Sequence, residues 1–466
     1  MVKNLNIIKR DGSIVKFNKC KIEDAILKAM KYGSGIYEEK IAKKIADEIE
    51  ISCFEKENSP TVYQVENMVY NKLIEYKHEL TAKAYEGYRA VQSFKREVNT
   101  TDDSIIGLLN KTNEEVINEN SNKNGILAST QRDLIAGEVS KDISRRKIIP
   151  AHIVHAHDEG VLHYHDMDYA MQSIHNCMLI NLEDMLQNGT VINNKLVESP
   201  KSFSTACTIV TQIIAQIASG QYGGNTITIR HIAPFLRVSY NKYFNKYKEK
   251  YSEEMAHELA EDRMLEELKS GIQTIRYQLS TLHTSNGQSP FSTIYLEIEE
   301  GHEYEREMAL ICEEMINQRL EGMKNHKGQQ IGEEFPKLVY LLDEHNCLEG
   351  GKYDYITKLA AKCNTKRLVP DYQSAKIMRR NYEGSTFPPM GCRSHLSPWK
   401  DENGNHKWYG RFNQGVISLN LVQVALTANK DMDKFWEILD ERLELCKEAL
   451  MVRHNLLLGT TSDVSP

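Results

Sequence analysis

The chain has 466 residues, more than a single hydrophobic core usually serves, so two or more domains are expected. Its formal net charge of -7 argues against a general nucleic-acid or membrane-surface binder and favours small-molecule partners, although local basic patches can still exist. No apolar run approaches the roughly 20 residues that span a bilayer, and no signal-peptide pattern is present, so we expect a cytoplasmic protein. The 9 cysteines are scattered without a Cys-x-x-Cys pair, which speaks against a zinc ribbon and a secreted disulfide framework.

The first residues predict a β-hairpin followed by helices. Two short apolar runs between residues 5 and 17 meet at Asp11-Gly12, a strong signal for a tight turn. Apolar residues at helical spacing then predict three helices, near residues 21–30, 38–49 and 62–76.

Basic residues crowd the same segment. Six cations stand among the first 21 residues against a single acid, Asp11, and such crowding suits an anion. The alternative is a solvated basic face on a small structural domain. The six cations are Lys3, Lys9, Arg10, Lys16, Lys19 and Lys21.

The order of hairpin, Lys-Arg-Asp-Gly turn, lysine-containing helix and closing Ala84-Tyr85-x-x-Tyr88-Arg89 segment resembles the ATP-cone, a regulatory nucleotide-binding domain. The resemblance covers residues 1–96. It implies that Lys9, Arg10 and Lys21 contact nucleotide phosphates, with Asn18 as a further candidate. Because the cone also occurs on a repressor of reductase genes, it does not by itself name an enzyme.

A polar stretch, residues 97–124, is rich in Asn, Thr, Asp, Glu and Ser and predicts a linker before a second domain at 125–466. The second domain opens with a helix predicted over 131–147, which Pro150 ends. Further on, the pattern predicts a buried strand over 173–182, a broad apolar helix after residue 205, and helices near 253–279, 303–319 and 435–454. The Gly223-Gly224 pair reads as a helix stop, since it lacks the ending of a phosphate-binding loop.

Five histidines lie within fourteen residues, at positions 152, 155, 157, 163 and 165. On strands, the pairs His155/His157 and His163/His165 would each face one side, as some metal hydrolases require. A helix over 151–157 would split the first pair and leave no three-ligand set. Polar histidines lining a helix and a strand entry are therefore favoured, and no metal ligand is assigned.

The loop from Thr386 to Ser394 places a cysteine where cysteines seldom serve packing. Pro388 and Pro389 lead into it, and Gly391 precedes Cys392, so the thiol can approach another group closely. This pattern suggests a reactive sulfur. A chance free thiol in a surface loop is the alternative.

Seven ordered motifs from about residue 100 onward resemble the large subunit of the anaerobic, class III ribonucleoside-triphosphate reductases. They are Asn176-Cys177-Met178-Leu179-Ile180, Ser199-Pro200-Lys201-Ser202, Tyr222-Gly223-Gly224, Asn286-Gly287-Gln288-x-Pro290-Phe291, Phe335-Pro336-Lys337-Leu338-Val339, Met390-Gly391-Cys392-Arg393-Ser394 and Gly415-Val416-Ile417-Ser418-Leu419-Asn420-Leu421.

This resemblance implies an α/β fold, a ten-stranded α/β barrel of two parallel five-stranded halves joined antiparallel, with a finger loop through its centre. The small, mostly helical cone precedes it. Cys392 would sit at the finger tip as the thiyl radical that abstracts the ribose 3′ hydrogen, and Cys177 would reduce the 2′ position as water leaves. Asn413 would orient the substrate, and Ser394 lies two residues after the radical cysteine.

The resemblance also implies reduction of ribonucleoside triphosphates to 2′-deoxyribonucleoside triphosphates, with formate as reductant and ATP/dATP as allosteric effectors. Glu198 and Lys201 would bind a specificity effector at a dimer interface; the alternative is a helix cap and a solvated lysine. A homodimer and a radical S-adenosylmethionine activating enzyme are the implied partners.

Family members carry a four-cysteine Zn site and a glycyl radical in an Arg-Val-x-Gly-Tyr segment, and neither motif occurs in this sequence. We therefore expect a chain that is incomplete at its carboxyl end and unable to reduce nucleotides alone. Two alternatives stay open: a non-catalytic, nucleotide-sensing protein derived from a reductase, and a histidine-metal hydrolase.

Overall fold

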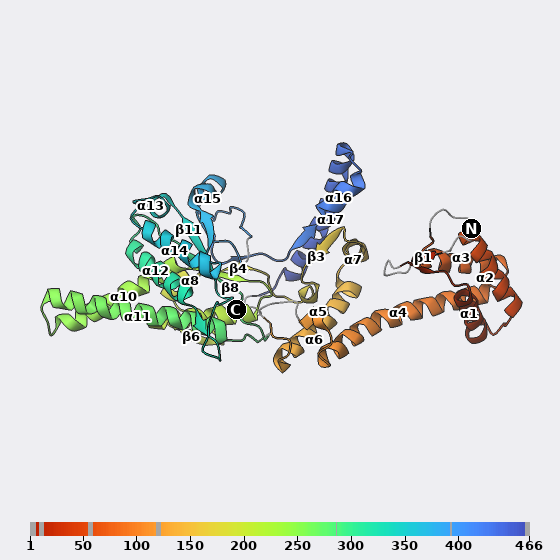
Figure 1. Cartoon of the computed structure of the whole chain (residues 1–466), viewed down its shortest axis with the longest axis horizontal. Coiled ribbons are helices and arrows are strands. Elements are labelled where there is room, and N and C mark those ends of the chain that lie inside the picture. Colours follow the sequence, from red (N-terminus) through yellow and green to blue (C-terminus); the bar gives the residue numbers. More distant parts are fainter. Residues whose placement is uncertain are drawn as a thin grey trace. The chain divides into compact units, whose positions relative to one another are not determined.

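The computed structural model describes residues 6–8, 14–54, 59–117, 123–285, 287–391 and 394–461. Lys9, Arg10 and Cys392 lie outside the described residues. The chain divides into two compact units, Met1–Ser104 and Ile105–Pro466 (Figure 1). Each unit is described by itself.

The first unit is a short hairpin with helices. Strands β1 (Asn6–Ile8) and β2 (Ile14–Lys16) pair antiparallel, as the apolar runs predicted. Apolar residues of the helices form one buried cluster, which includes Ile26, Ile45 and Leu73. The helices are α1 (Cys20–Ala29), the π-turn η1 (Met30–Ser34), α2 (Glu39–Phe54), α3 (Val62–Glu75) and α4 (Glu79–Leu109).

Much of the stretch expected to be a linker is helical. Helix α4 continues to Leu109, and α5 (Glu114–Ile117) follows. Ile105 and Leu108 stand three residues apart, so they share a helix face; Leu108 is fully buried, and its carbonyl accepts a hydrogen bond from Gln131. Two apolar residues at this spacing outweigh the polar composition of the segment.

A six-stranded sheet organises the second unit. Its order is β12-β11-β8-β7-β4-β13; the first five strands run parallel, and β13 pairs antiparallel with β4. The expected strand over 173–182 is reduced to two residues. The strands are β4 (Met178–Leu179), β7 (Asn225–Thr228), β8 (Ser292–Leu296), β11 (Lys337–Leu342), β12 (Asp371–Ser374) and β13 (Arg411–Phe412).

Helices connect the successive parallel strands, as right-handed crossovers in parallel sheets require. Ile227 and Ile294 point into the large core that these helices share with the sheet. Thr226 and Thr293, one residue earlier on each strand, face the other side, because side chains alternate along a strand. The crossover helices are α8 (Leu182–Gln187), α9 (Phe203–Ser219), α10 (Ala233–Lys248), α11 (Glu253–Thr281), α12 (Glu305–Glu321), α13 (Glu344–Cys347) and α14 (Asp354–Arg367).

A smaller core lies beside the sheet. Strand β3 (Leu162–Tyr164) pairs antiparallel with β14 (Ile417–Leu419), and α7 (Ala151–Asp158) and α17 (Met432–Leu457) pack on this pair. Among the described residues, no helix combines the length and apolar character needed to cross a membrane. The other elements are α6 (Ala128–Ile143), η2 (Ser144–Ile148), η3 (Met167–Tyr169), β5 (Thr190–Ile192), β6 (Lys195–Val197), η4 (Ile229–His231), β9 (Met323–Lys324), β10 (Gln330–Ile331), α15 (Ala375–Asn381) and α16 (Leu421–Ala428).

Candidate active site

The segment 384–391 runs along the face of the sheet opposite the crossover helices. Its first residues lie with Leu341 and Glu297 at the carboxyl ends of β11 and β8. Further on, the Thr226 hydroxyl donates to the Pro389 carbonyl at 2.8 Å, and the Thr293 hydroxyl donates to the Gly391 carbonyl at 2.8 Å. The segment therefore crosses the sheet from its carboxyl edge to its amino edge and delivers Gly391, the neighbour of Cys392, to the amino ends of β7 and β8.

Cys177 lies at this amino edge, directly before β4. It is 7% exposed, its sulfur accepts the Gly224 N–H at 3.3 Å, and its thiol lies 3.4 Å from Asn176 Oδ1. A Cβ added at Gly391 would come within 2.8 Å of the Cys177 sulfur. Cys177 and the residue before Cys392 are thus in direct contact.

Asn413 makes two hydrogen bonds with Cys177 and one with Asn176. Its side-chain Oδ1 accepts the Cys177 N–H at 2.6 Å, its backbone N–H donates to the Cys177 carbonyl at 3.0 Å, and its carbonyl accepts the Asn176 N–H at 3.1 Å. Its Nδ2 group has no hydrogen-bond partner among the residues that the structure describes. The amide can therefore donate to a substrate oxygen without giving up its hold on Cys177.

Three glycines make this approach of backbones possible. A Cβ at Gly223 would overlap Asn176 Oδ1 at 2.0 Å and the Cys177 sulfur at 2.7 Å. At Gly224 it would meet the Phe291 ring at 2.2 Å and Gly391 Cα at 2.8 Å, and Gly391 itself has φ +47°. The sequence pattern read Gly223-Gly224 as a helix stop, but α9 ends earlier, at Ser219, and the pair instead packs around the sulfur.

An apolar cluster covers the sulfur on the side of the 384–391 segment. Phe387 is fully buried and stacks on Trp408 with ring centroids 3.9 Å apart, and Met390 and Leu179 complete the contact. The groups that the structure describes as hydrogen-bonded to Cys177 are all neutral. A dry, neutral surrounding suits a sulfur that must react without competing water.

The structure also describes five other residues that the sequence predicted. Ser394 is exposed, and its carbonyl accepts the Met390 N–H at 2.7 Å. Asn18 Oδ1 accepts the Cys20 N–H at 3.0 Å, and Lys21 is exposed. Glu198 and Lys201 are exposed on the segment between β6 and α9. The roles of all five stay predictions.

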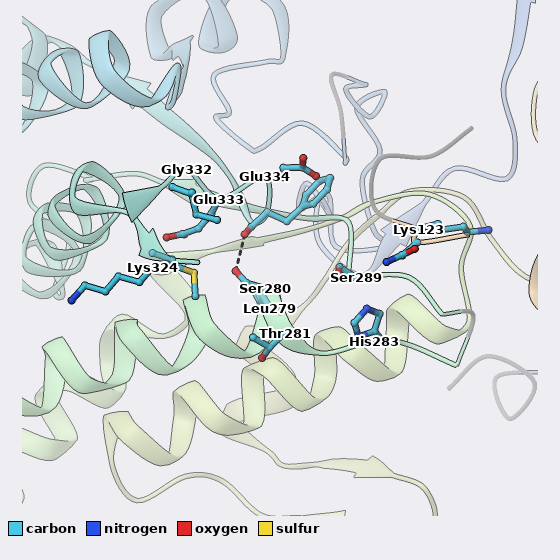
Figure 2. Close-up of a pocket in the computed structure, with 14 residues that line it drawn as sticks. Lys123, Leu279, Ser280, Thr281, His283, Ser289, Lys324, Gly332, Glu333 and Glu334 are labelled. Atoms are coloured by element: carbon cyan, nitrogen blue, oxygen red, sulfur yellow. Dashed lines mark hydrogen bonds between the residues drawn. The ribbon is translucent and has the colours of Figure 1, made fainter. Parts of the chain in front are cut away.

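A cavity of about 420 Å³ opens at the same amino edge of the sheet (Figure 2). Phe335 forms part of its wall and lies 4.8 Å, between ring centroids, from Phe291, which contacts Gly224. Lys123 enters from one side and is held by Asp133 at 2.9 Å, and the Ser280 hydroxyl donates to the Phe335 carbonyl at 3.3 Å. The cavity therefore lies next to the thiol centre and combines apolar walls with polar groups, as small-molecule sites do.

A second cavity, of about 260 Å³, lies at the carboxyl edge and is strongly polar. Arg230 contacts Glu297 at 2.9 Å and Glu299 at 2.7 Å. Arg379 and Asp343 form another pair. Burial raises the pKa of the Glu297 carboxyl, and the Arg230 charge opposes that shift.

The histidines lie on α7 and β3, as the helical alternative required. His157 Nδ1 accepts the Tyr164 N–H at 3.2 Å, and His165 contacts the Ser418 hydroxyl at 2.7 Å. Burial and the nearby His163 lower the pKa of both rings. Among the described residues, no group of three His, Cys, Asp or Glu side chains is arranged to hold a metal ion.

Several residues of the centre gave no recognisable signal in the sequence. Thr226 and Thr293 are ordinary strand residues until the 384–391 segment lies across them. Phe291 and Phe335 belong to quoted motifs, but only the fold shows that their rings meet.

Comparisons with known proteins agree on the family. The family model described as anaerobic ribonucleoside-triphosphate reductase matches residues 119–466, and the ATP cone domain model matches residues 5–94. The anaerobic ribonucleoside-triphosphate reductase of Escherichia coli is 38% identical over 473 residues, which cover 99% of this chain and 64% of that protein. The Enterobacteria phage T4 enzyme is 39% identical, over 79% of this chain and 61% of its own length.

The fold is similar to that of a solved anaerobic ribonucleotide reductase from Thermotoga maritima, described with dATP bound in its specificity site. The TM-score is 0.53 at 16% sequence identity, with 78% of this chain and 62% of that chain covered. This chain spans about 64% of the length of the Escherichia coli relative. The matched motifs, the family model and the curated relatives together show that the chain belongs to the anaerobic ribonucleoside-triphosphate reductase family.

Proposed function

We propose that this chain carries the thiol centre of an anaerobic reductase that converts ribonucleoside triphosphates to 2′-deoxyribonucleoside triphosphates. The contact of the Cys177 sulfur with Gly391, the residue before Cys392, is the observation that carries this proposal. Cys392 follows Gly391 directly in the sequence, so we infer that it reaches the Cys177 sulfur, 215 positions away by number (392 − 177).

The chemistry explains why two sulfurs and an amide belong together. The ribose C–H bond is too strong for acid–base removal, whereas a Cys392 thiyl radical can accept the 3′ hydrogen and return it later. Cys177 donates a hydrogen atom toward the 2′ position as the hydroxyl leaves as water, and formate, oxidised to carbon dioxide, supplies the two electrons of the net reduction. Asn413 orients the ribose hydroxyls through its Nδ2 group, which does not titrate near neutral pH.

The cavity beside Phe335 is the proposed entry for the nucleotide. It opens at the same sheet edge as Cys177, and its lining includes Lys123, Lys324 and His283, three groups suited to phosphate or base oxygens. Figure 2 shows His283 and Ser289 close together between Lys123 and the end of α11.

The five parallel strands form, in this proposal, one half of a ten-stranded barrel, and the 384–391 segment is its finger loop. The domain division at 1–96, 97–124 and 125–466 is proposed on the same basis. We also propose that formate is the reductant, that the chain forms a homodimer, and that a radical S-adenosylmethionine enzyme activates it.

The first unit would bind ATP or dATP as an effector, through Lys9, Arg10, Lys21 and Asn18. Its support is the ATP cone model over residues 5–94. Glu198 and Lys201 are proposed for a second, specificity effector, as the description of the Thermotoga maritima structure suggests for that protein.

An anaerobic turnover assay tests the function, with CTP, formate, S-adenosylmethionine, the activating enzyme and this chain joined to the glycyl-radical part expected from the family. Substituting Cys392→Ser or Cys177→Ser should abolish dCTP formation, at least 1,000-fold on the scale of essential nucleophiles. The exposed thiol variant Cys347→Ser should retain the parent activity. Formation of dCTP by the Cys392→Ser protein would refute the assignment.

A further inference from the structure

Arg453, near the end of α17, reaches into the backbone that leads to the thiol centre. Its Nη1 donates to the carbonyls of Tyr169 at 3.1 Å and Ala170 at 2.9 Å, and also to that of Gln172. Its Nη2 donates to the Ile174 carbonyl, and its Nε to the Gln414 carbonyl at 3.3 Å. One guanidinium thus binds five backbone carbonyls.

The five carbonyls belong to two segments that are distant in sequence. Residues 169–174 lead to Asn176 and Cys177, and Gln414 directly follows Asn413. These are the same two segments that exchange hydrogen bonds between Cys177 and Asn413. Arg453 therefore bridges the segment that leads to Cys177 and the segment that carries Asn413, a few residues from the Cys177 sulfur.

Arg453 lines a small cavity together with Tyr164, Asp166 and Tyr222. Arg453 is 3% exposed. Carbonyl dipoles and the Tyr222 ring, 5.6 Å from the guanidinium carbon, are among its surroundings. The Tyr222 hydroxyl donates to the same Gln414 carbonyl at 2.9 Å. Burying a guanidinium whose hydrogen-bond partners are all carbonyls costs free energy. Because these charge-assisted hydrogen bonds form only when the two segments lie as they do here, Arg453 favours this arrangement of the segments.

We propose that Arg453 is a positioning residue for the thiol centre: it fixes the segments that carry Cys177 and Asn413 and keeps the Cys177 sulfur against the loop tip. It touches neither sulfur nor substrate. An effect of Arg453 on turnover rests on the proposed function. Its effect on the position of Cys177 does not.

The test measures the thiol directly in the full chain. Cys177 alkylation by N-ethylmaleimide is followed by peptide mass spectrometry, which separates Cys177 from the other cysteines. In Arg453→Met the rate should rise at least tenfold, and hydrogen exchange of peptides covering 174–179 and 411–416 should accelerate. Arg453→Lys keeps the charge but offers fewer and less spread donors, so it should restore part of the protection.

Arg319→Met is the control for loss of a buried arginine: Arg319 donates to the backbone carbonyls of Glu333 and Pro336, and it also pairs with the Glu333 carboxylate at 3.6 Å. The Arg319→Met variant should have lower thermal stability, but the rate of Cys177 alkylation should not rise. Equal Cys177 rates in Arg453→Met and Arg319→Met, at equal loss of thermal stability, would overturn the proposal. Because no turnover is measured, the proposed reductase function could fail while this result stands, or the reverse.

Discussion

The surroundings of Cys177 and the polar cavity at the carboxyl edge of the six-stranded sheet differ in charge. At the amino edge, Cys177 forms hydrogen bonds with the neutral groups of Asn176, Gly224 and Asn413 and lies in an apolar cluster with Phe387 and Trp408. At the carboxyl edge, a polar cavity is lined by ionised side chains, of which Arg230 and Glu297 are one pair. The 384–391 segment connects the two edges.

This difference suggests that one edge of the sheet carries the thiol and the other stabilises the 384–391 segment. Ligands of open parallel sheets commonly bind beyond the carboxyl ends of the strands, yet here the thiol centre lies at the amino ends. The charged pairs instead surround the start of the 384–391 segment. We infer that the carboxyl edge stabilises the segment, whereas the amino edge supplies a dry place for sulfur chemistry.

Glu297→Ala should have the largest effect on stability, a loss of about 3–4 kcal/mol, because it leaves the Arg230 guanidinium short of its buried partner. Glu297→Gln keeps the shape and should cost less. Urea unfolding measures both, with the exposed Glu300→Ala as control. If the two edges are separate in function, the Cys177 alkylation rate of folded Glu297→Gln stays at the parent value. A strong rise would contradict that separation.

Gly224→Ala should cost about 2–3 kcal/mol, since the new methyl group would overlap the Phe291 ring and Gly391 Cα. The overlap pushes the loop tip from Cys177, so alkylation of Cys177 should also accelerate. Gly384→Ala, where added atoms meet open space but φ is +81°, controls for backbone strain alone. An unchanged rate of Cys177 alkylation in folded Gly224→Ala would show that the position of Gly391 beside Cys177 does not depend on its contact with Gly224.

Acid should destabilise the amino edge through His175, two residues before Cys177. Burial, helped by the Arg453 charge, lowers the pKa of His175 to about 4 from 6.5. The unfolded chain then binds the proton more readily, so the stability due to neutral His175 is complete above pH 6.5 and is lost as the pH falls toward 4. Between pH 7.5 and 5 the loss is about 2 kcal/mol.

His175→Gln should remove that part of the pH dependence in urea unfolding curves. The exposed His326→Gln variant should keep the parent slope. Identical slopes in all three proteins would mean that His175 accepts a proton without loss of its buried position.

Thr293→Val should have the smallest effect, about 1 kcal/mol, because it removes one hydrogen bond to the Gly391 carbonyl while keeping the side-chain shape. Thermal unfolding measures the loss. Thr357→Val, which removes the hydroxyl contact with Tyr340 away from the loop, is the comparison. Only Thr293→Val should also raise Cys177 alkylation, and an equal rate in both would contradict a specific role in holding the tip.

The sequence predicted the elements with strong periodicity well. Helices α9, α11 and α17 follow from their apolar spacing, and the hairpin β1–β2 follows from its two apolar runs. The strand at Cys177 is shorter than predicted, because its flanking residues bind Asn413 and Gly224 rather than a longer ladder. The stretch 97–109 is helical because Ile105 and Leu108 outweigh its polar neighbours.

The sequence predicted only those residues of the site that belong to recognisable motifs. The family resemblance implies roles for Cys177, Cys392 and Asn413, and the structure brings Cys177 and Asn413 together by hydrogen bonds that no local pattern encodes. The roles of Gly224, Thr293 and Arg453 depend on contacts between segments more than 35 residues apart. Such contacts are set by the topology of the sheet, which a single sequence does not display.

We propose that Cys392 meets Cys177, which contacts Gly391 at the amino edge of the sheet. Mild oxidation of the reduced chain with diamide, followed by peptide mass spectrometry, tests it directly, because a disulfide forms only between cysteines whose Cα atoms come within about 7 Å. The account predicts Cys177–Cys392 as the main disulfide, lost in Cys177→Ser and Cys392→Ser and diminished in Arg453→Met. Oxidation that joins Cys392 to other cysteines while Cys177 stays reduced would contradict it.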